Sequence, residues 1–335
     1  MKNMFRSKAF AIIVFMSIVA LLLAGCGSSS SGGSEGSGDT AIDYPTKPIN
    51  VIVPWAAGGD SDVIARITHK YLEKELGQKF IVTNIGGAGG TIGAQEGMQA
   101  DPDGYTLIAG HDSIAVSHLM GKSDFSYFEF EPVSLITTAN QLIATHIDNE
   151  WNSMEDVINA LKEDPESISF GATVGSTTHI VPLGIQDRAD VKFNIVSYEG
   201  TAERTQALLG NHLHLGSTTI PAAKEYIKAN QLKMLAIASE ERNPALPDVP
   251  TLKEQGIDFV NATNRGYFFP KGTPKEIVKI MNDALKKVSE NPDYIKEMED
   301  MGIDVNFKDT EEYTKYLQDD VAFMEEMLKR QGIID

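Results

Sequence analysis

The sequence predicts an α/β fold in which parallel-rich sheets are flanked by helices and the chain is divided into two lobes. Strand-like and helix-like segments alternate along most of the chain, a pattern typical of parallel sheets covered by helices. Glycine-rich loops recur where a strand gives way to a helix, in both halves of the chain. About 290 residues follow the N-terminal low-complexity segment, more than one hydrophobic core usually organises.

The first residues predict export. Lys2, Arg6 and Lys8 precede an apolar run over residues 9–23, and Leu-Ala-Gly-Cys follows, ending at Cys26. A basic start, an apolar core and small residues are typical of a secretory signal, here residues 1–25, and not of a membrane span. The Leu-Ala-Gly-Cys box resembles that of bacterial lipoproteins, in which Cys26 would be lipidated; the alternative is an ordinary signal with a chance cysteine.

Residues 26–43 are predicted to comprise the lipidated cysteine and a Ser/Gly tether. A segment of serine and glycine cannot bury apolar surface, so it is expected to be a flexible tether. The expected location is extracytoplasmic, anchored to the cell membrane on its outer face or in a periplasm. Cys26 is the only cysteine, so no disulfide can form within the chain. The net charge of −18 disfavours nucleic acid and anionic lipid surfaces as partners. It does not exclude an anionic ligand, because surface charges are screened within about 10 Å at ordinary salt.

The first strand–helix unit is predicted as a strand over residues 49–53, a loop over 54–62 and a helix that Gly77 ends. Ile64, Ile67, Tyr71 and Leu72 share the apolar face of that helix. The second unit is a strand over residues 80–84, a glycine loop over 86–90 and a short helix from Thr91. Glycines allow backbone N–H groups to approach a ligand, and helix N-termini carry partial positive charge. These loops therefore indicate an anion site built from backbone.

The same alternation continues to the C-terminus. Further strands are predicted over residues 105–109, 141–146, 168–171, 193–198, 212–215 and 232–238. Further helices are predicted over residues 113–120, 153–162, 201–209, 221–228, 274–289, 292–301 and 310–330, with another after residue 179.

Each candidate loop has a purely structural alternative. Trp55 could be a core residue and Asp62 a first-turn helix acid, and the glycines of residues 86–90 could serve only a turn. In the third loop, residues 175–179, a hydroxyl could be an N-cap, and His179 could be a packed structural residue. The fourth loop, residues 198–201, could offer a phenol and backbone donors or form only a turn.

Taken together, the motifs resemble one family over residues 44–335. The matching runs are Tyr44-Pro45-x-Lys47-Pro48-Ile49, Val53-Pro54-Trp55-x-Ala57-Gly58-Gly59-x-x-Asp62, Gly87-Ala88-Gly89-Gly90, Pro102-Asp103-Gly104-Tyr105-Thr106-Leu107, Gly175-Ser176-x-x-His179, Tyr198-x-Gly200, Leu246-Pro247-Asp248-Val249-Pro250-Thr251 and Pro270-x-Gly272-Thr273-Pro274. They are similar to the receptors of tripartite tricarboxylate transporters, the TctC or Bug proteins.

The resemblance implies a type II periplasmic-binding-protein-like fold with a hinge between its lobes. Lobe 1 would comprise residues 44–143 and 264–335, and lobe 2 residues 144–263. The expected function is capture of a small organic carboxylate and its delivery to membrane permease subunits, by a monomer without cofactor or metal. The residues expected to line the ligand site are Trp55, Ala57, Gly58, Gly59, Asp62, Gly87, Gly89, Ser113, Gly175, Ser176, Thr177, His179, Tyr198, Gly200 and Thr218.

Departures from the family pattern bear on the ligand. His214 and Thr218 stand where the family usually has acidic residues facing the cleft, which argues against a ligand amine. Glu199 stands where lysine is common, so the resemblance does not imply citrate. Residues 84–86 also lack the family's arginine and proline.

Two functions other than a transport receptor remain as alternatives. A secreted hydrolase is disfavoured, because Gly-x-Ser-x-Gly occurs only within the Ser/Gly tether, at residues 32–36, where no strand–turn–helix is expected, and His-Glu-x-x-His does not occur; the chain is not expected to be an enzyme. A sensor that presents its ligand to a membrane signalling protein would have the same fold, so that alternative stays open.

Overall fold

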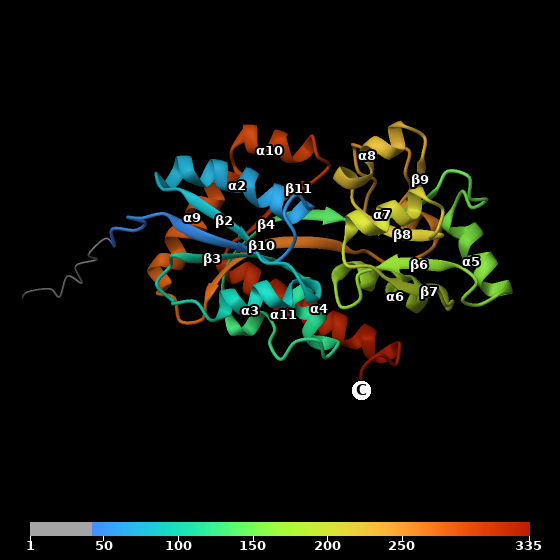
Figure 1. Cartoon of the computed structure of the whole chain (residues 1–335), viewed down its shortest axis with the longest axis horizontal. Coiled ribbons are helices and arrows are strands. Elements are labelled where there is room, and N and C mark those ends of the chain that lie inside the picture. The colour runs from blue at the N-terminus through green and yellow to red at the C-terminus, as the bar shows by residue number, and fades with distance from the viewer. Residues whose placement is uncertain (1–41) are drawn as a thin grey trace, which may run out of the picture. The chain divides into compact units, whose positions relative to one another are not determined.

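The computed structural model describes residues 42–335, coloured from blue to red along the chain in Figure 1. The predicted signal peptide, Cys26 and most of the predicted tether lie outside the described residues. Within residues 42–335, no helix is both long and apolar enough to cross a membrane.

The first sheet has six strands in the order β11-β4-β10-β3-β1-β2. β1 lies between β2 and β3 and is parallel to both, whereas β10 pairs antiparallel with β3 and β4, and β11 pairs antiparallel with β4. The strand bounds are β1 (Ile49–Val53), β2 (Phe80–Asn84), β3 (Thr106–His111), β4 (Phe130–Asn140), β10 (Ala262–Pro270) and β11 (Asp304–Lys308).

The second sheet has five strands in the order β7-β6-β8-β5-β9. β6 is parallel to β7 and β8, and β5 pairs antiparallel with β8 and β9. The bounds are β5 (Leu142–His146), β6 (Ser169–Ala172), β7 (Asn194–Ser197), β8 (Leu215–Thr218) and β9 (Leu232–Ile237).

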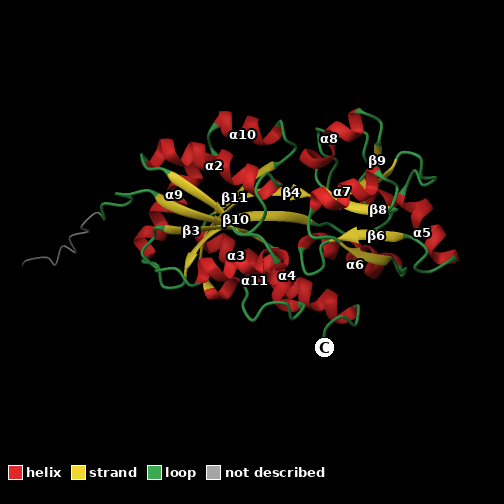
Figure 2. Cartoon of the chain, viewed as in Figure 1, coloured by secondary structure: helices red, strands yellow, loops and turns green. Residues whose placement is uncertain are grey.

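Helices cover both faces of the first sheet, as Figure 2 shows in red against the yellow strands. One face carries α2 (Asp60–Leu76), α9 (Lys275–Ser289) and α10 (Pro292–Glu299), and the other carries α3 (Thr91–Met98), α4 (Ser113–Leu119) and α11 (Thr310–Arg330). The second sheet is accompanied by α5 (Met154–Glu163), α6 (Thr177–Ala189), α7 (Thr201–Leu209) and α8 (Ile220–Lys228). Single turns of 3-10 helix are η1 (Ala88–Gly90), η2 (Tyr127–Glu129) and η3 (Lys253–Gln255).

The α2 helix shows how local sequence determines an element here. Ile64, Tyr71 and Leu72 are buried against the first sheet, as their spacing predicts. Gly77 ends the helix in a left-handed conformation with φ of 67°, and its N–H donates to the Glu73 carbonyl. The predicted helix and its glycine stop are confirmed.

Three strands were not predicted, namely β4, β10 and β11. β4 contains Pro132 and several polar residues, and β10 contains Arg265 and Gly266, so neither shows regular alternation. Their pairing joins residues far apart in the chain, for example Ala262 with Asn140. These strands make the first sheet mixed rather than wholly parallel, and β5 does the same for the second sheet.

The predicted strand over residues 212–215 is wrong by three positions, because β8 covers Leu215–Thr218. The preceding residues form a turn, in which the His212 N–H donates to the Ala207 carbonyl at 2.9 Å. His214 therefore precedes β8 at its amino end, whereas Thr218 is its last residue.

The chain passes between the two sheets at two neighbouring points. One is Gln141, between β4 and β5, and the other is the segment that links β9 to β10. The Gln141 N–H donates to the Asn261 carbonyl at 3.1 Å, and the Ala238 N–H donates to the Gln141 carbonyl at 2.8 Å. These bonds hold the two connections side by side.

Candidate functional site

The first glycine loop joins β1 to α2. Gly58 has φ of +76°, a left-handed conformation that residues with a Cβ rarely adopt. Gly59 is the N-cap residue of α2, and no side chain of the described residues caps the helix there. Ala57, Gly58 and Gly59 are exposed. The start of this 17-residue helix thus offers exposed backbone and the positive end of a helix dipole.

Asp62 is buried beneath this loop and holds it in place. Its carboxylate accepts hydrogen bonds from the Gly58 N–H at 2.8 Å and from Arg66 Nε at 2.9 Å. A third hydrogen bond comes from Asn84 Nδ2 at 3.0 Å. Burial works to raise the pKa of Asp62, but these hydrogen bonds outweigh it and hold the pKa below its usual value. The carboxylate is therefore ionised and directed at the protein's own loop, which makes Asp62 a positioning residue.

The Trp55 ring stacks on the imidazole of His111, with centroids 3.6 Å apart and planes 13° apart. Gly90 also contacts the Trp55 indole, since a Cβ on Gly90 would lie 2.8 Å from Trp55 Cζ2. His111 was not predicted as a site residue. Burial, together with the charge of Arg265, lowers its pKa well below the usual value. The Ser113 N–H donates to His111 Nδ1 at 3.3 Å, so the proton of the neutral ring is on Nε2.

The second glycine loop contacts the third loop, which belongs to the other sheet. Gly89 has φ of 69°, and a Cβ there would lie 3.4 Å from Ser117 Oγ and 3.6 Å from the Gly175 carbonyl oxygen. Ser117 in turn donates a hydrogen bond to that carbonyl at 2.8 Å. Gly87, with φ of 122°, is exposed.

The third loop also meets α4 of the first sheet. The Thr177 N–H donates to Ser113 Oγ at 3.2 Å, and the Thr177 hydroxyl lies 3.3 Å from Thr263 Oγ1. Ser176 is the N-cap residue of α6 and accepts a hydrogen bond from the Thr178 N–H at 3.3 Å. Ser113 and Thr177, expected to line one site, therefore come together from different sheets.

His179 is packed within the protein. Its Nδ1 lies 3.4 Å from Met120 Sδ. Burial, together with the charge of Lys122, lowers the pKa of His179 to about 4, so the ring is neutral at pH 7. These contacts match the structural interpretation of this histidine.

The remaining predicted residues lie at the carboxyl ends of β7 and β8. Tyr198 is half-buried against a small apolar cluster, and Gly200 is the N-cap residue of α7. Thr218 ends β8, is 2% exposed, and has no hydrogen-bond partner for its hydroxyl among the described residues. Glu199 is exposed, and its N–H donates to Glu203 at 3.0 Å.

His214 does not lie with these residues, which corrects the expectation that it faces the cleft. It accepts a hydrogen bond on Nδ1 from the Ser169 N–H at 3.1 Å, at the start of β6. Its ring meets Trp151 edge-on, with centroids 5.5 Å apart. The site loops follow the opposite, carboxyl ends of β6 and β8.

Two buried arginines near the site were missed in the sequence. Arg204 of α7 is 1% exposed, and Arg265 of β10 is 8% exposed. Asp60, in the first turn of α2, accepts a hydrogen bond from the Thr219 hydroxyl of the second lobe at 2.6 Å. In the described part of the chain, no cluster of three or more His, Cys, Asp or Glu side chains is placed to hold a metal ion.

Comparison with known proteins gives a consistent result. The family model described as "Tripartite tricarboxylate transporter family receptor" (TctC) matches residues 64–333. Protein BugT of Bordetella pertussis is 32% identical over 72% of this chain and 76% of its own length. MatC from Rhodopseudomonas palustris with bound malate has a TM-score of 0.78 and 28% identity, over 85% of this chain and 100% of its own.

A second solved structure, an R. palustris protein with adipate, has a TM-score of 0.81 and 25% identity, over 87% of this chain and 99% of its own. These likenesses confirm the predicted two-lobed, periplasmic-binding-protein-like α/β fold. The chain belongs to the tripartite tricarboxylate transporter receptor family.

Proposed function

We propose that this protein is an extracytoplasmic solute-binding receptor that captures a small carboxylate between two lobes and delivers it to a tripartite tricarboxylate-type permease. The observation that carries the proposal is the meeting of the predicted loops across the two sheets. The Thr177 N–H bonds to Ser113 Oγ, and Ser117 bonds to the Gly175 carbonyl, beside the uncapped start of α2.

The chemistry of these loops suits an anion. A buried carboxylate is costly unless several donors meet it, and charge-assisted hydrogen bonds are stronger than neutral ones. The start of α2 and the exposed loop before it supply backbone N–H groups, and the second lobe supplies hydroxyls. The malate and adipate bound by the two similar proteins support a carboxylate as the ligand.

The proposed mechanism is hinge closure about the two connections at Gln141 and Asn261. In the open form the loops would exchange hydrogen bonds with water. A carboxylate that bridges them would stabilise the closed form. The lobes would be residues 44–143 with 264–335, and residues 144–263. On this proposal the protein catalyses no reaction, acts as a monomer, and is anchored at the cell membrane through a lipid on Cys26.

A thermal-shift screen tests the proposal. The purified protein is heated with mono-, di- and tricarboxylates, amino acids and aromatic acids in separate samples. A ligand at 100-fold over its dissociation constant stabilises the folded state by about 2.7 kcal/mol. For a protein of this size, the midpoint should rise by roughly 5–10 °C. If a folded preparation responds to no acid, and mass spectrometry of denatured protein finds no co-purified acid, the proposal is wrong.

A further inference from the structure

Two buried arginines flank the loops that meet between the lobes, one from each side. Arg204 belongs to α7 in the second lobe, and Arg265 belongs to β10 in the first lobe. Among residues 42–335, neither guanidinium forms a salt bridge with a carboxylate. A buried charge that forms no direct salt bridge is unfavourable, so two such arginines need an explanation.

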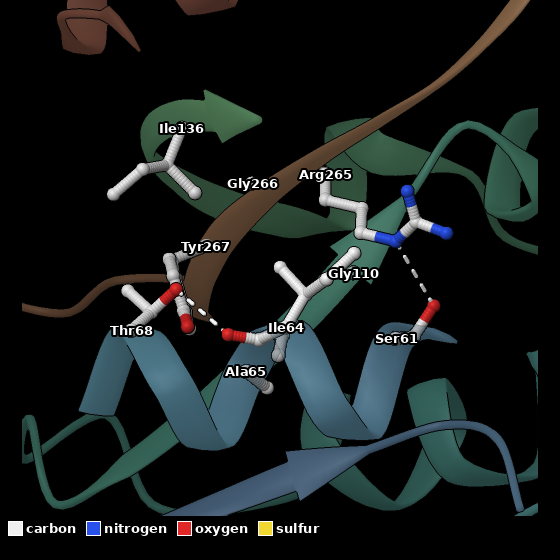
Figure 3. A pocket seen from close by; sticks show the side chains of 10 residues that line it. Ser61, Ile64, Ala65, Thr68, Gly110, Ile136, Arg265, Gly266 and Tyr267 are labelled. Carbon is white, nitrogen blue, oxygen red and sulfur yellow. Dashed lines mark hydrogen bonds between the residues drawn. The ribbon is translucent and has the colours of Figure 1, made fainter. Parts of the chain in front are cut away.

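Arg265 extends over the first turn of α2, as Figure 3 shows. Its Nε donates to Ser61 Oγ at 3.2 Å and its Nη1 to the Thr263 carbonyl at 3.4 Å. Its Nη2 has no hydrogen-bond partner among the described residues. A cation at a helix N-terminus also meets the positive end of the helix dipole, which is the unfavourable arrangement. An anion placed between the guanidinium and the start of α2 would interact favourably with each of them.

Arg204 occupies a slot lined by two glycines of the second sheet. A Cβ on Gly171 would lie 3.1 Å from Arg204 Cδ, and one on Gly216 would lie 3.3 Å from it. Its Nε donates to the Ser217 carbonyl at 2.6 Å. Nη1 and Nη2 reach Thr173 and Thr201, at 3.4 and 3.2 Å, in the loops that carry the predicted site. The slot therefore aims the guanidinium at those loops.

A guanidinium has five N–H donors. The described residues accept three hydrogen bonds from Arg204 and two from Arg265. Both groups thus keep donors for a ligand. The cavity beside Arg265 lies between α2 and the first sheet and is about 10 Å³, room for roughly one water molecule, so a carboxylate would have to meet the guanidinium outside this cavity.

The charges around the two arginines include acids as well as guanidinium groups. Asp60 is the acid whose charge acts on both arginines. Asp112 also acts on Arg265, but burial and the neighbouring Asp320 favour its neutral form. Asp62 is ionised but paired with Arg66, and Glu203 lies in the first turn of α7. Each arginine still brings unused donors to the loops on its own side, and two such groups suit the two ends of a dianion.

We propose that Arg204 and Arg265 make this receptor selective for a dicarboxylate. One carboxylate group would bind beside Arg265 and the first turn of α2, and the other beside Arg204 and the start of α7. This inference rests on the proposed carboxylate-receptor function. It excludes a ligand ammonium group next to either arginine, because like charges would meet in a buried site. A monocarboxylate would leave one guanidinium without a counter-charge.

Calorimetric titration of the full chain tests the inference. The probes are unbranched dicarboxylates from malonate to suberate, malate and terephthalate, each paired with the monocarboxylate of the same chain length or with benzoate for the aromatic acid. The variants are Arg204→Gln and Arg265→Gln. Arg242→Gln is the matched control, because Arg242 is exposed and paired with Glu254.

We expect at least one dicarboxylate to bind about tenfold or more tightly than its monocarboxylate. Each buried-arginine variant should weaken dicarboxylate binding roughly 10- to 100-fold, as loss of a charge-assisted hydrogen bond implies, and bring the two affinities close together. Arg265→Lys should retain part of the preference, and Arg242→Gln should change neither affinity.

The unfolding midpoint without ligand provides an independent readout. Removing a buried charge that forms no salt bridge should leave the midpoint of Arg265→Met unchanged or higher. If the variants fail to fold or melt several degrees lower without ligand, the arginines are structural and the inference is wrong. Equal binding of mono- and dicarboxylates by wild type would overturn the inference while leaving the receptor function standing. Binding of no carboxylate would overturn both.

Discussion

Replacing Asp62 with alanine tests how the first loop is prepared for a ligand. The substitution removes an acceptor for three hydrogen bonds, from the Gly58 N–H, Arg66 and Asn84. The loop is exposed, so water can satisfy the freed donors in part. Hydrogen bonds to a charged group contribute about 1.5–3 kcal/mol each, and with water as a substitute we expect a loss of about 2–3 kcal/mol in total. The variant should remain folded, since natural domains are stable by about 5–15 kcal/mol.

The effect on ligand binding should come from the backbone. Without its anchor, the segment at Gly58 and Gly59 must be ordered by the ligand. Ordering one residue costs about 1–2 kcal/mol, so a cost of that order weakens binding roughly 5- to 30-fold. The assay is calorimetric titration with the acid that the thermal-shift screen identifies, and it measures the dissociation constant.

Glu73→Ala is the matched control, because Glu73 lies on the same helix and accepts hydrogen bonds from Lys79 and from the Phe80 N–H, far from the loop. This control should lose stability but keep wild-type affinity.

The Asp62 effect on stability should be present at neutral pH and disappear in acid. The pKa of Asp62 is lowered in the folded state, so its contribution exists above the usual Asp value near 3.9 and is lost as the pH falls through the folded value. Wild-type affinity in Asp62→Ala, or equal weakening in Glu73→Ala, would refute this reasoning.

Two further predictions concern other parts of the chain. Burial raises the pKa of Asp320 to about 7, so its folded form favours the proton, and stability should fall as the pH rises from about 4 through 7. The free energy of unfolding of Asp320→Asn should therefore exceed that of wild type at pH 8, by up to roughly 4 kcal/mol, with no difference near pH 4; an equal difference at both pH values would contradict this. Cys26→Ser should release unanchored or unprocessed protein, as fractionation of cells would show, and unchanged membrane anchoring would exclude lipidation of Cys26.

The sequence predicted the elements whose signals are local. The α2 helix has an apolar face and a glycine stop, and both are visible over a few residues. β4 and β10 have no such signal, because their strand character depends on pairing with each other across more than a hundred residues. The hinge connections and the mixed first sheet follow from those two strands, so they could not be predicted from local pattern.

The candidate site shows the same division. Glycine loops at helix starts can be predicted from the sequence, because the positive φ angles of Gly58 and Gly89 favour glycine at those positions. The roles of Asp62 and Ser176 could not be predicted, since an acid or hydroxyl at the start of a helix can face either a ligand or the protein's own backbone. A faint signal did exist for Arg204. Gly171 and Gly216 interrupt two buried strands, and glycine within a strand often marks the close approach of another group.

The net charge of −18 and an anionic ligand are compatible because the two act at different depths. Most acidic side chains lie at the surface, many in exposed ion pairs such as Lys296 with Asp300 and Lys315 with Asp319. Salt screens such charges within about 10 Å, whereas charges buried away from water are screened much less. In the proposed complex a bound carboxylate would therefore experience mainly Arg204, Arg265 and the helix ends around it. Specificity in this chain should then depend on which few charges are buried at the loops, and the total charge should affect mainly solubility and the rate of encounter.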